Sequence, residues 1–448
     1  MRDNKISLRS LTLPILVETL LRTTLSSVDT FMLGRFADQA AGAVGAIQQF
    51  MFFTLVVYTV GATGTSIIVS QYLGAGRKHT AAEVSLVAIL FNLGIGVFLS
   101  IVMRLAMPYI LDSLKLEYIV RTYAEQYVRV YFTFSFFQAV SVVLSAILRS
   151  HGYSKLPMYV NMGANLLNII GNYIFLFGPG GLPVLGVTGV AISTVSSQFL
   201  GVAAMLVMIF KHKDISLFKD KAIKLRFTYA KDIVKIGAPS AGETLSYNLA
   251  QVAILYMIAP MGTIALTSYT YSVILSRFAY IIALSLGGAS QILVGHKVGK
   301  GDNDDAFMEV IKATAIGMMS GFFVMSLMAV FRYKVVGLLT SNQDIIELTA
   351  KILLISVIYE TGRPMNLIVI SGLKGAGDVL FPVMAGIIMM WGISVTGAWF
   401  FGVHIAMGLV GIWIGRMLDE WLRGIVMLIR WFSRAWHGKS VVREEISA

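Results

Sequence analysis

The sequence contains no cysteine, which excludes disulfide bonds and metal sites built from thiolates. Charge is also scarce, because only 13% of the 448 residues are Asp, Glu, Lys or Arg, whereas 56% are hydrophobic. With a mean hydropathy of +0.76, a water-soluble protein of this length would lack polar surface. Long apolar runs recur from end to end, so we expect an all-α polytopic membrane protein.

The motifs of common hydrolases and nucleotide-driven pumps are missing too. No HExxH, P-loop, GxSxG or paired-histidine metal spacing occurs. No polar stretch is long enough for a nucleotide-binding domain, and no cluster of histidines, serines or acids suggests a membrane-embedded enzyme. We therefore expect a protein that is not an enzyme and needs no cofactor, with energy supplied by an ion gradient or by the gradient of the substrate itself.

Twelve apolar runs are each about long enough to cross a bilayer, which takes roughly 20 helical residues. Glycine is far commoner than proline, 42 to 9, which fits closely packed membrane helices. The predicted spans are residues 10–34, 45–70, 85–110, 123–148, 157–178, 185–210, 233–258, 264–294, 308–331, 345–372, 382–402 and 405–430.

Lysine and arginine gather in alternate connections between these spans, as they do on the cytoplasmic side of membrane proteins. Both termini are therefore expected to be cytoplasmic, in the inner membrane of a bacterium or archaeon. The formal net charge of +12 is explained by these loops, so we expect the lipid bilayer as a partner and no nucleic acid. We also expect a monomer.

The second half of the chain repeats the first at a fixed offset. PILVETL begins at Pro14 and PSAGETL at Pro239, which lie 225 residues apart. The same offset joins Gly76 to Gly301, and Pro157 to Pro382. A shared offset in three places indicates a duplicated unit.

Each repeat holds six spans, and an even number returns the chain to its starting side. The two copies are therefore parallel, forming six-helix lobes related by a pseudo-two-fold axis along the membrane normal. We predict an N-terminal lobe over 1–210, a cytoplasmic linker over 211–231, and a C-terminal lobe with a cytoplasmic tail over 232–448. The architecture suggests alternating access by rocking of the lobes.

The first span carries ionisable residues that are expensive at membrane depth. Glu18 and Arg22 are four residues apart on a helix and can neutralise each other. Asp29 lies about 10 Å further along the axis and has no evident partner in its own helix. An intramembrane acid of this kind is a functional-site hypothesis, and we expect Asp29 to exchange a cation.

Residues present in only one repeat are the better candidates for chemistry. Asp29 corresponds to Ile254. The first repeat alone also has a stripe of amides on one face of its fifth span, Asn161, Asn165, Asn168 and Asn172, whose counterparts are Gly386, Met390, Ile393 and Gly397. Amide oxygens and a carboxylate can coordinate Na⁺, and a desolvated carboxylate can carry H⁺. The alternative is that the amides only hydrogen-bond neighbouring helices.

The second repeat has candidates of its own. Glu243 is the counterpart of Glu18, so both could belong to the scaffold or to a substrate cavity. Glu360 and Arg363 replace Ser135 and Gln138 of the first repeat, and can form an ion pair on one helix, structural or in contact with substrate. In the last span we expect Arg416, Asp419, Glu420 and Arg423 to pair among themselves. Arg277 has no visible partner.

The sequence resembles the multidrug and toxic compound extrusion (MATE) transporters, and a bacterial branch near their DinF and YpnP-like members. The matching segments follow one another in order: VDTFMLGR, VSQYLGAGRKHTAA, NLLNIIGNYIF, LVGHKVGKGDNDDA and ETGRPMNLIVISGLKGAGDVLFPV. The resemblance implies two lobes that export mostly cationic, amphipathic compounds in exchange for Na⁺ or H⁺. It matches the acid of the family's first span to Asp29, and its fifth-span polar pair to Asn168 and Asn172.

Two departures from the family qualify this resemblance. Asn172 stands where some relatives have an acid, which weakens a proton site of two carboxylates. The second-lobe acids of sodium-coupled members of the NorM type fall on Tyr247 and Arg363. A second-lobe Na⁺ site would therefore depend on the nearby Glu243 and Glu360.

We predict multidrug efflux by antiport, with Asp29, Asn165, Asn168 and Asn172 coupling to H⁺ or to Na⁺ bound at Asp29, Asn168 and Asn172. Small organic cations are the expected partners, and Glu18, Glu243, Glu360 and Arg363 are candidates for the substrate cavity. The alternative is a flippase or exporter of lipid-linked or anionic substrates, for which Arg22, Arg277 and Arg363 would supply positive charge.

Overall fold

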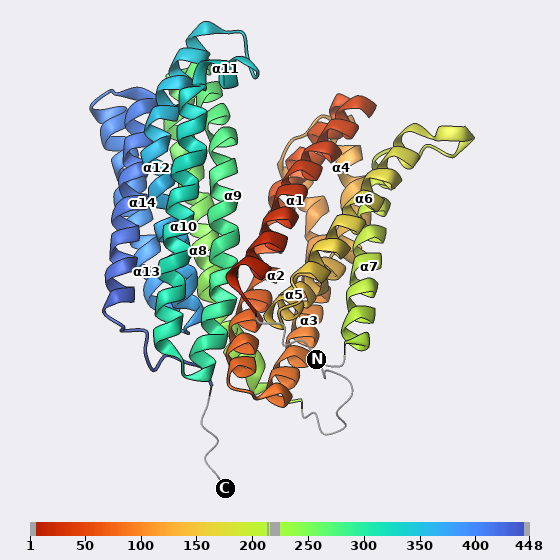
Figure 1. Ribbon diagram of the computed structural model, residues 1–448. Helices are drawn as coiled ribbons and strands as arrows, with labels where there is room; N and C mark the ends of the chain where they lie inside the picture. The colour runs from red at the N-terminus through yellow and green to blue at the C-terminus, as the bar shows by residue number, and fades with distance from the viewer. Residues whose placement is uncertain (1–5, 213–214, 216–224, 443–448) are drawn as a thin grey trace. The chain divides into compact units, whose positions relative to one another are not determined.

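The computed structural model describes residues 6–212, 215 and 225–442, and over these ranges the chain forms helices and no strand. Within the predicted linker at 211–231, residues 213–214 and 216–224 lie outside the described residues. The helices of the first repeat are α1 (Leu8–Phe36), α2 (Asp38–Gly74), α3 (Lys78–Ser113), α4 (Tyr118–Tyr131), α5 (Phe136–Ser150), α6 (Lys155–Phe177) and α7 (Gly186–Lys211) (Figure 1).

The second repeat has the same order of long helices. They are α8 (Thr228–Ile258), α9 (Thr263–Lys300), α10 (Asn303–Val330), the short α11 (Arg332–Gly337), α12 (Gln343–Gly375), α13 (Leu380–Met389) and α14 (Gly408–Phe432). Two π-helical segments, Met390–Val395 and Ala398–His404, continue α13.

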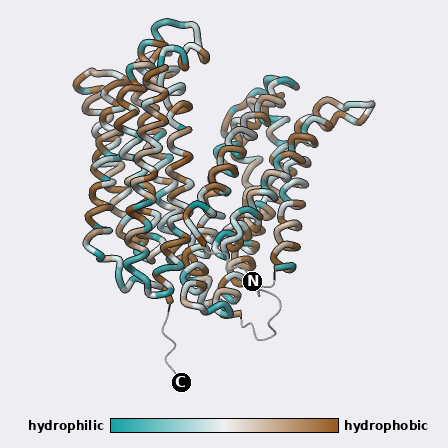
Figure 2. The backbone as a smooth tube through the Cα atoms, in the orientation of Figure 1, coloured by the Kyte–Doolittle hydropathy of each residue, from teal (hydrophilic) through white to brown (hydrophobic). Residues whose placement is uncertain are grey.

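Twelve helical segments correspond to the twelve predicted spans, which confirms the fold class. Eight helices of the described chain are long and apolar enough to cross a membrane, and α4 with α5 makes a ninth span bent by 49°. The remaining three, α8, α12 and α14, are 25 to 33 residues long and carry ionisable side chains. Figure 2 shows hydrophobic residues along the helices and hydrophilic residues gathered at many of their ends.

Glycines of the repeat end helices in equivalent places. Gly76 and Gly301 have φ of 74° and 85°, and Gly152 and Gly377 have φ of 83° and 96°. These left-handed conformations are strained for residues with a Cβ atom. The 225-residue repeat therefore preserves glycine where the backbone must turn between helices.

Two compact units make up the described chain, and they exchange the beginnings of two helices. The first unit holds the described residues between 17 and 241, and the second holds residues 6–16 and 242–442. The two boundaries, after Leu16 and after Ala241, are again 225 residues apart. Within the second unit, Leu11 at the start of α1 is fully buried and packs with Ala289 and Leu293 of α9.

The start of α8 packs within the first unit in the corresponding way. A Cβ atom on Gly237 would lie 1.9 Å from the backbone oxygen of Val60, and one on Gly64 would lie 2.3 Å from that of Ile233. Only glycine permits such an approach of two helix backbones. The contact is therefore specified by one glycine on each of α2 and α8.

Candidate functional site

Asp29 lies in the first unit, where α1 faces the asparagines of α6. Its side chain is half-buried, and Asn172 Nδ2 donates a hydrogen bond to Asp29 Oδ1 at 2.8 Å. Asn172 itself is 1% exposed. The structure thus gives Asp29 a polar partner on another helix, while leaving it without a cationic one among the described side chains.

Asn168 completes the surroundings of the Asp29 carboxylate. Only one orientation of the Asn168 side-chain amide gives both its nitrogen and its oxygen suitable hydrogen-bond partners. In this orientation Nδ2 lies 3.1 and 3.3 Å from the two oxygens of Asp29, and Oδ1 accepts from the backbone N–H and the hydroxyl of Thr194. Asp29 therefore accepts hydrogen bonds from two asparagines one helical turn apart on α6.

One oxygen beside this carboxylate remains unused. Asn172 Oδ1 is buried and has no hydrogen-bond partner among the described residues, although a buried amide oxygen is normally bonded. An oxygen of this kind next to a carboxylate fits a small hard cation such as Na⁺. The described residues contain no group of three or more His, Cys, Asp or Glu that could hold a metal ion.

Glu18 binds a partner far away in the sequence. Arg149 Nη2 donates to both Glu18 oxygens, at 2.7 and 2.8 Å, and Asn161 Nδ2 donates to Oε1 at 2.8 Å. The predicted neutralisation by Arg22 is therefore wrong, because Arg149 of α5 reaches the carboxylate instead. Asn161, at the other end of the predicted stripe, serves Glu18 and not Asp29.

Asn165 lies between these two contacts. It is half-buried and makes no hydrogen bond with another described side chain. Its part in ion coupling stays a prediction.

The second unit repeats the ion pair of Glu18. Lys374 Nζ lies 2.6 Å from Glu243 Oε2, and Lys374 and Glu243 are the counterparts of Arg149 and Glu18 in the repeat. Each carboxylate is thus neutralised by a base at an equivalent place in the repeat, Arg149 on α5 and Lys374 on α12. This geometry favours the scaffold interpretation of the two acids over the substrate-cavity one.

The position of Asp29 has an apolar counterpart in the second unit. Ile254 is fully buried in a core cluster with Leu409, Ile412 and Trp413. Gly397, the counterpart of Asn172, packs against α14, where a Cβ atom would lie 3.1 Å from Gly415 Cα. The difference between the repeats is therefore also structural: a polar contact in the first unit corresponds to an apolar packing contact in the second.

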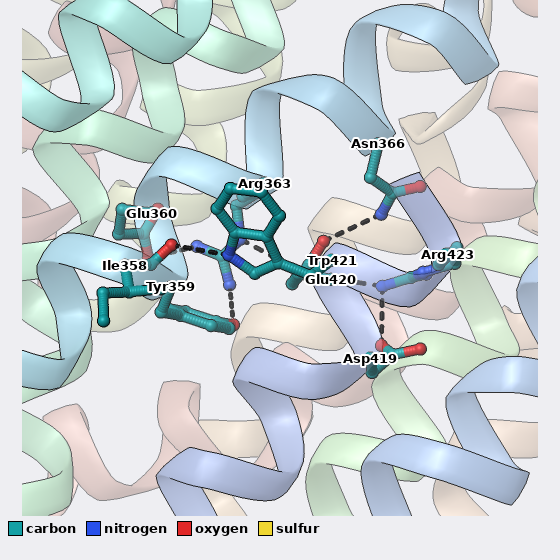
Figure 3. Close-up of polar contacts among 9 residues, drawn as sticks. All are labelled: Ile358, Tyr359, Glu360, Arg363, Asn366, Asp419, Glu420, Trp421 and Arg423. Atoms are coloured by element: carbon teal, nitrogen blue, oxygen red, sulfur yellow. Dashed lines mark hydrogen bonds and ion pairs between the residues drawn. The ribbon is translucent and has the colours of Figure 1, made fainter. Parts of the chain in front are cut away.

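Charged residues of α12 and α14 form a buried network in the second unit (Figure 3). Arg363 Nη1 donates to Glu360 Oε1 at 2.7 Å, and Arg363 Nε donates to Glu420 Oε1 at 3.4 Å. The Arg363 guanidinium also bonds the Tyr359 hydroxyl. The predicted pair of Glu360 and Arg363 exists, and Glu420 joins it from the other helix.

The network continues along α14. Asn366 Nδ2 donates to Glu420 Oε2 at 2.8 Å, and Arg423 Nη2 lies 2.8 Å from Asp419 Oδ2 and 3.4 Å from Glu420 Oε1. Trp421 Nε1 donates to the backbone oxygen of Ile358 and ties the two helices together. Each of these acids has a guanidinium partner, so the network resembles a structural cross-link more than an ion site.

Arg416 does not join this network, contrary to the expectation that it pairs within its helix. It lines a cavity of about 310 Å³, together with the predicted cavity residues Glu360 and Arg363 and the unexplained Arg277. A second cavity of about 240 Å³ is lined by Glu243, Lys374, Glu420 and Arg423, among others, and its charges pair with one another.

Sequence reasoning misses several contributors to these contacts. In the sequence, Arg149 and Lys374 resemble ordinary loop charges, and Thr194 attracts no attention. The offset of 225 could have found the first two, because it joins Arg149 to Lys374 just as it joins Glu18 to Glu243. No comparable signal marks Thr194, whose role depends on the packing of α6 against α7.

Twelve helical segments in two repeats, with an acid held by two asparagines of a neighbouring helix, are typical of a multi-pass membrane transporter and not of an enzyme. A model of the MatE family matches residues 14–174 and 239–400. The two matched segments begin at the positions that the repeat joins. The chain belongs to the MatE family, whose members include multidrug efflux transporters.

Relatives support this assignment over almost the full length. The chain is 38% identical over 441 residues to the uncharacterized transporter YisQ of Bacillus subtilis, covering 98% of this chain and 96% of that protein. It is 24% identical to the probable multidrug resistance protein NorM of Thermotoga maritima, covering 97% and 94%. A crystal structure of MATE in the straight conformation matches with a TM-score of 0.87 at 21% identity, covering 95% of each chain.

Proposed function

We propose that the protein exports amphipathic, mostly cationic organic compounds in exchange for H⁺ or Na⁺ taken up at Asp29. The observation that carries the proposal is the Asp29 carboxylate, half-buried beside Asn168 and Asn172 without a cationic partner among the described residues. A carboxylate at membrane depth is costly unless it is neutralised. A coupling cation supplies that neutralisation.

In the proposed cycle, Asp29 binds its cation from outside and releases it inward. The empty carboxylate then favours an organic cation, or a conformation that binds one. The two affinities are linked reciprocally, so substrate binding must also promote release of the coupling ion. Alternating access between the two lobes completes the exchange.

Both coupling ions have support in the same site. The unused Asn172 Oδ1 and the Asp29 oxygens are ligands of the kind Na⁺ takes. A half-buried carboxylate with only neutral partners is equally suited to carry H⁺. Asn165 is proposed to contribute polarity from the same face of α6.

The setting of the proposed function is the inner membrane, with the protein as a monomer and both termini cytoplasmic. The distribution of lysine and arginine supports this orientation. A reporter fused to either terminus should remain on the cytoplasmic side. The second candidate function, export of lipid-linked or anionic substrates, is favoured by the arginines of the 310 Å³ cavity.

The direct test uses purified protein in liposomes with an imposed pH or Na⁺ gradient and ethidium as the transported cation. We expect gradient-driven ethidium movement in the wild type and its loss in Asp29→Asn. The matched control is Asp38→Asn, the same change at an exposed acid in the first turn of α2, which should transport normally. Full transport by Asp29→Asn would refute the mechanism.

A further inference from the structure

The cavity of about 310 Å³ lies among α8, α9, α12 and α14 of the second unit. Aromatic side chains form a large part of its walls, and these are Tyr247, Tyr269, Tyr280, Tyr359 and Trp413. This volume is at the lower end of small-molecule pockets, and aromatic walls suit a flat apolar body. The cavity can therefore hold one small aromatic compound.

The charge of the lining is one-sided. Arg277, Arg363 and Arg416 face a single acid, Glu360. Arg363 is held between Glu360 at 2.7 Å and Glu420 at 3.4 Å, so its charge is compensated. Two arginines remain, and the cavity has an excess of positive charge.

Two charged residues of this lining have a buried polar atom without a hydrogen-bond partner among the described residues, Glu360 (Oε2) and Arg416. Glu360 forms an ion pair with Arg363, and Arg416 forms none with a described side chain. It is 5% exposed, no described carboxylate pairs with it, and its Nη1 atom is buried without a hydrogen-bond partner. A buried charge is costly without a close partner, and the carboxylates of Glu360 and Asp419 act on Arg416 only at longer range than an ion pair.

Aromatic rings provide part of the compensation. The guanidinium carbon of Arg416 lies 4.9 Å from the ring centre of Trp413, 5.5 Å from that of Tyr359 and 5.7 Å from that of Tyr269. Such contacts stabilise the charge. They do not supply the acceptor that the Nη1–H groups lack.

We propose that this cavity binds an amphipathic aromatic anion, with a carboxylate or comparable acidic group on Arg416 and the ring against Trp413 and the tyrosines. The two oxygens of a carboxylate can accept hydrogen bonds from two N–H groups of one guanidinium when the two groups are coplanar. Arg277, exposed and without an ion pair among the described residues, adds positive charge where the anion enters.

The corresponding positions of the first repeat carry no arginine. The counterpart of Arg416 is Ala191, and those of Arg277 and Arg363 are Phe52 and Gln138. The acid at Asp29 and the unpaired arginine at Arg416 thus belong to different repeats. A bulky lipid is a poor occupant because two acyl chains exceed the volume of the cavity.

The inference goes beyond the proposed export of cations, and a transport role for the anion would rest on the second candidate function, export of anionic substrates. Binding alone does not depend on Asp29. A test of binding at equilibrium, without a gradient, therefore separates the two proposals.

The experiment measures binding of radiolabelled 1-naphthaleneacetate to the purified full-length protein by equilibrium dialysis. Its neutral amide and 1-naphthylmethylamine, which is cationic, serve as analogues with the same ring. We expect saturable binding of the acid, at least tenfold tighter than binding of either analogue. Arg416→Met should reduce the affinity for the acid at least tenfold, to the level of the amide.

Two further variants serve as a control and as a second test of the site. Arg430→Met removes an arginine of the same helix that pairs with Asp378 at 2.9 Å, away from this cavity, and should leave binding unchanged. Arg277→Met, at an exposed position, should weaken binding of the acid several-fold even if Arg416→Met does not fold.

Equal affinities for the acid and its amide in the wild type, or an equal loss in Arg430→Met, would overturn the proposal. Displacement of the bound acid by phosphatidylglycerol at lower concentrations than by unlabelled 1-naphthaleneacetate would assign the site to lipid and also overturn it. Absent binding with intact ethidium antiport refutes only the anion site. Intact binding with normal transport by Asp29→Asn refutes only the antiport mechanism.

Discussion

Arg149 binds both carboxylate oxygens of Glu18, at 2.7 and 2.8 Å, across 131 residues of sequence. Lys374 binds Glu243 across the same separation in the second repeat. The duplication thus preserved an ion pair between the first and fourth spans of each half. The base changed from arginine to lysine, and a bidentate contact became a single one.

Loss of the pair of Glu18 and Arg149 should destabilise the first unit. Glu18→Gln leaves Arg149 half-buried without its acid, and charged hydrogen bonds are worth about 1.5–3 kcal/mol. We expect a lower apparent melting temperature in detergent for Glu18→Gln and Arg149→Gln, with the double variant less affected than the two losses added together. Additive losses in this double-mutant cycle would show that the two residues do not interact.

A stronger effect is expected at Glu360. Its side chain is 1% exposed and pairs with Arg363, which is 7% exposed, so Glu360→Gln leaves a buried charge poorly compensated. Removing one partner of such a pair costs about 3–5 kcal/mol. The apparent melting temperature should fall clearly and recover in part when Arg363→Gln is added.

The exposed pair of Arg434 and Asp304 is the control for Glu360, since its side chains are 44% and 80% exposed. Asp304→Asn should have little effect on the melting temperature. Equal shifts for Glu360→Gln and Asp304→Asn would contradict the structural role given to the α12–α14 network.

The next prediction concerns the part of the α6 asparagines in ion coupling. Asn172→Leu removes the 2.8 Å hydrogen bond to Asp29 and the unused Oδ1 atom. We expect at least a tenfold higher concentration of the coupling ion for half-maximal transport in liposomes. Asn165→Leu, which breaks no hydrogen bond to a described side chain, should shift that concentration less.

Much of this architecture could be predicted from the sequence. The helical spans follow from apolar runs, and the repeat follows from residues such as Pro14 and Pro239. The spacing of Asn168 and Asn172 predicts that both lie on one face of their helix, and in the structure this face lies beside Asp29. Helical periodicity and span length determine these features locally.

Contacts between distant segments could not be derived in this way. The pairing of Glu18 with Arg149 depends on the packing of α1 against α5, and the proximity of Arg22 in the sequence suggested a different partner. The isolation of Arg416 was hidden because Asp419 and Glu420 lie within about a turn of it on α14. Those acids point to Arg363 and Arg423 instead.

The start of α8 can approach α2 closely because both helices have glycine at the contact, and this provides a test of the fold. A Cβ atom on Gly237 would lie 1.9 Å from the backbone oxygen of Val60, a contact that requires α8 and α2 to move apart. Gly237→Ala should therefore lower the melting temperature and the yield of folded protein. Gly242 lies further along α8, and a Cβ atom added there would have nothing within 4 Å, so Gly242→Ala should be neutral or stabilise by up to about 1 kcal/mol. A stable Gly237→Ala protein would show that the two helices do not approach closely at this point.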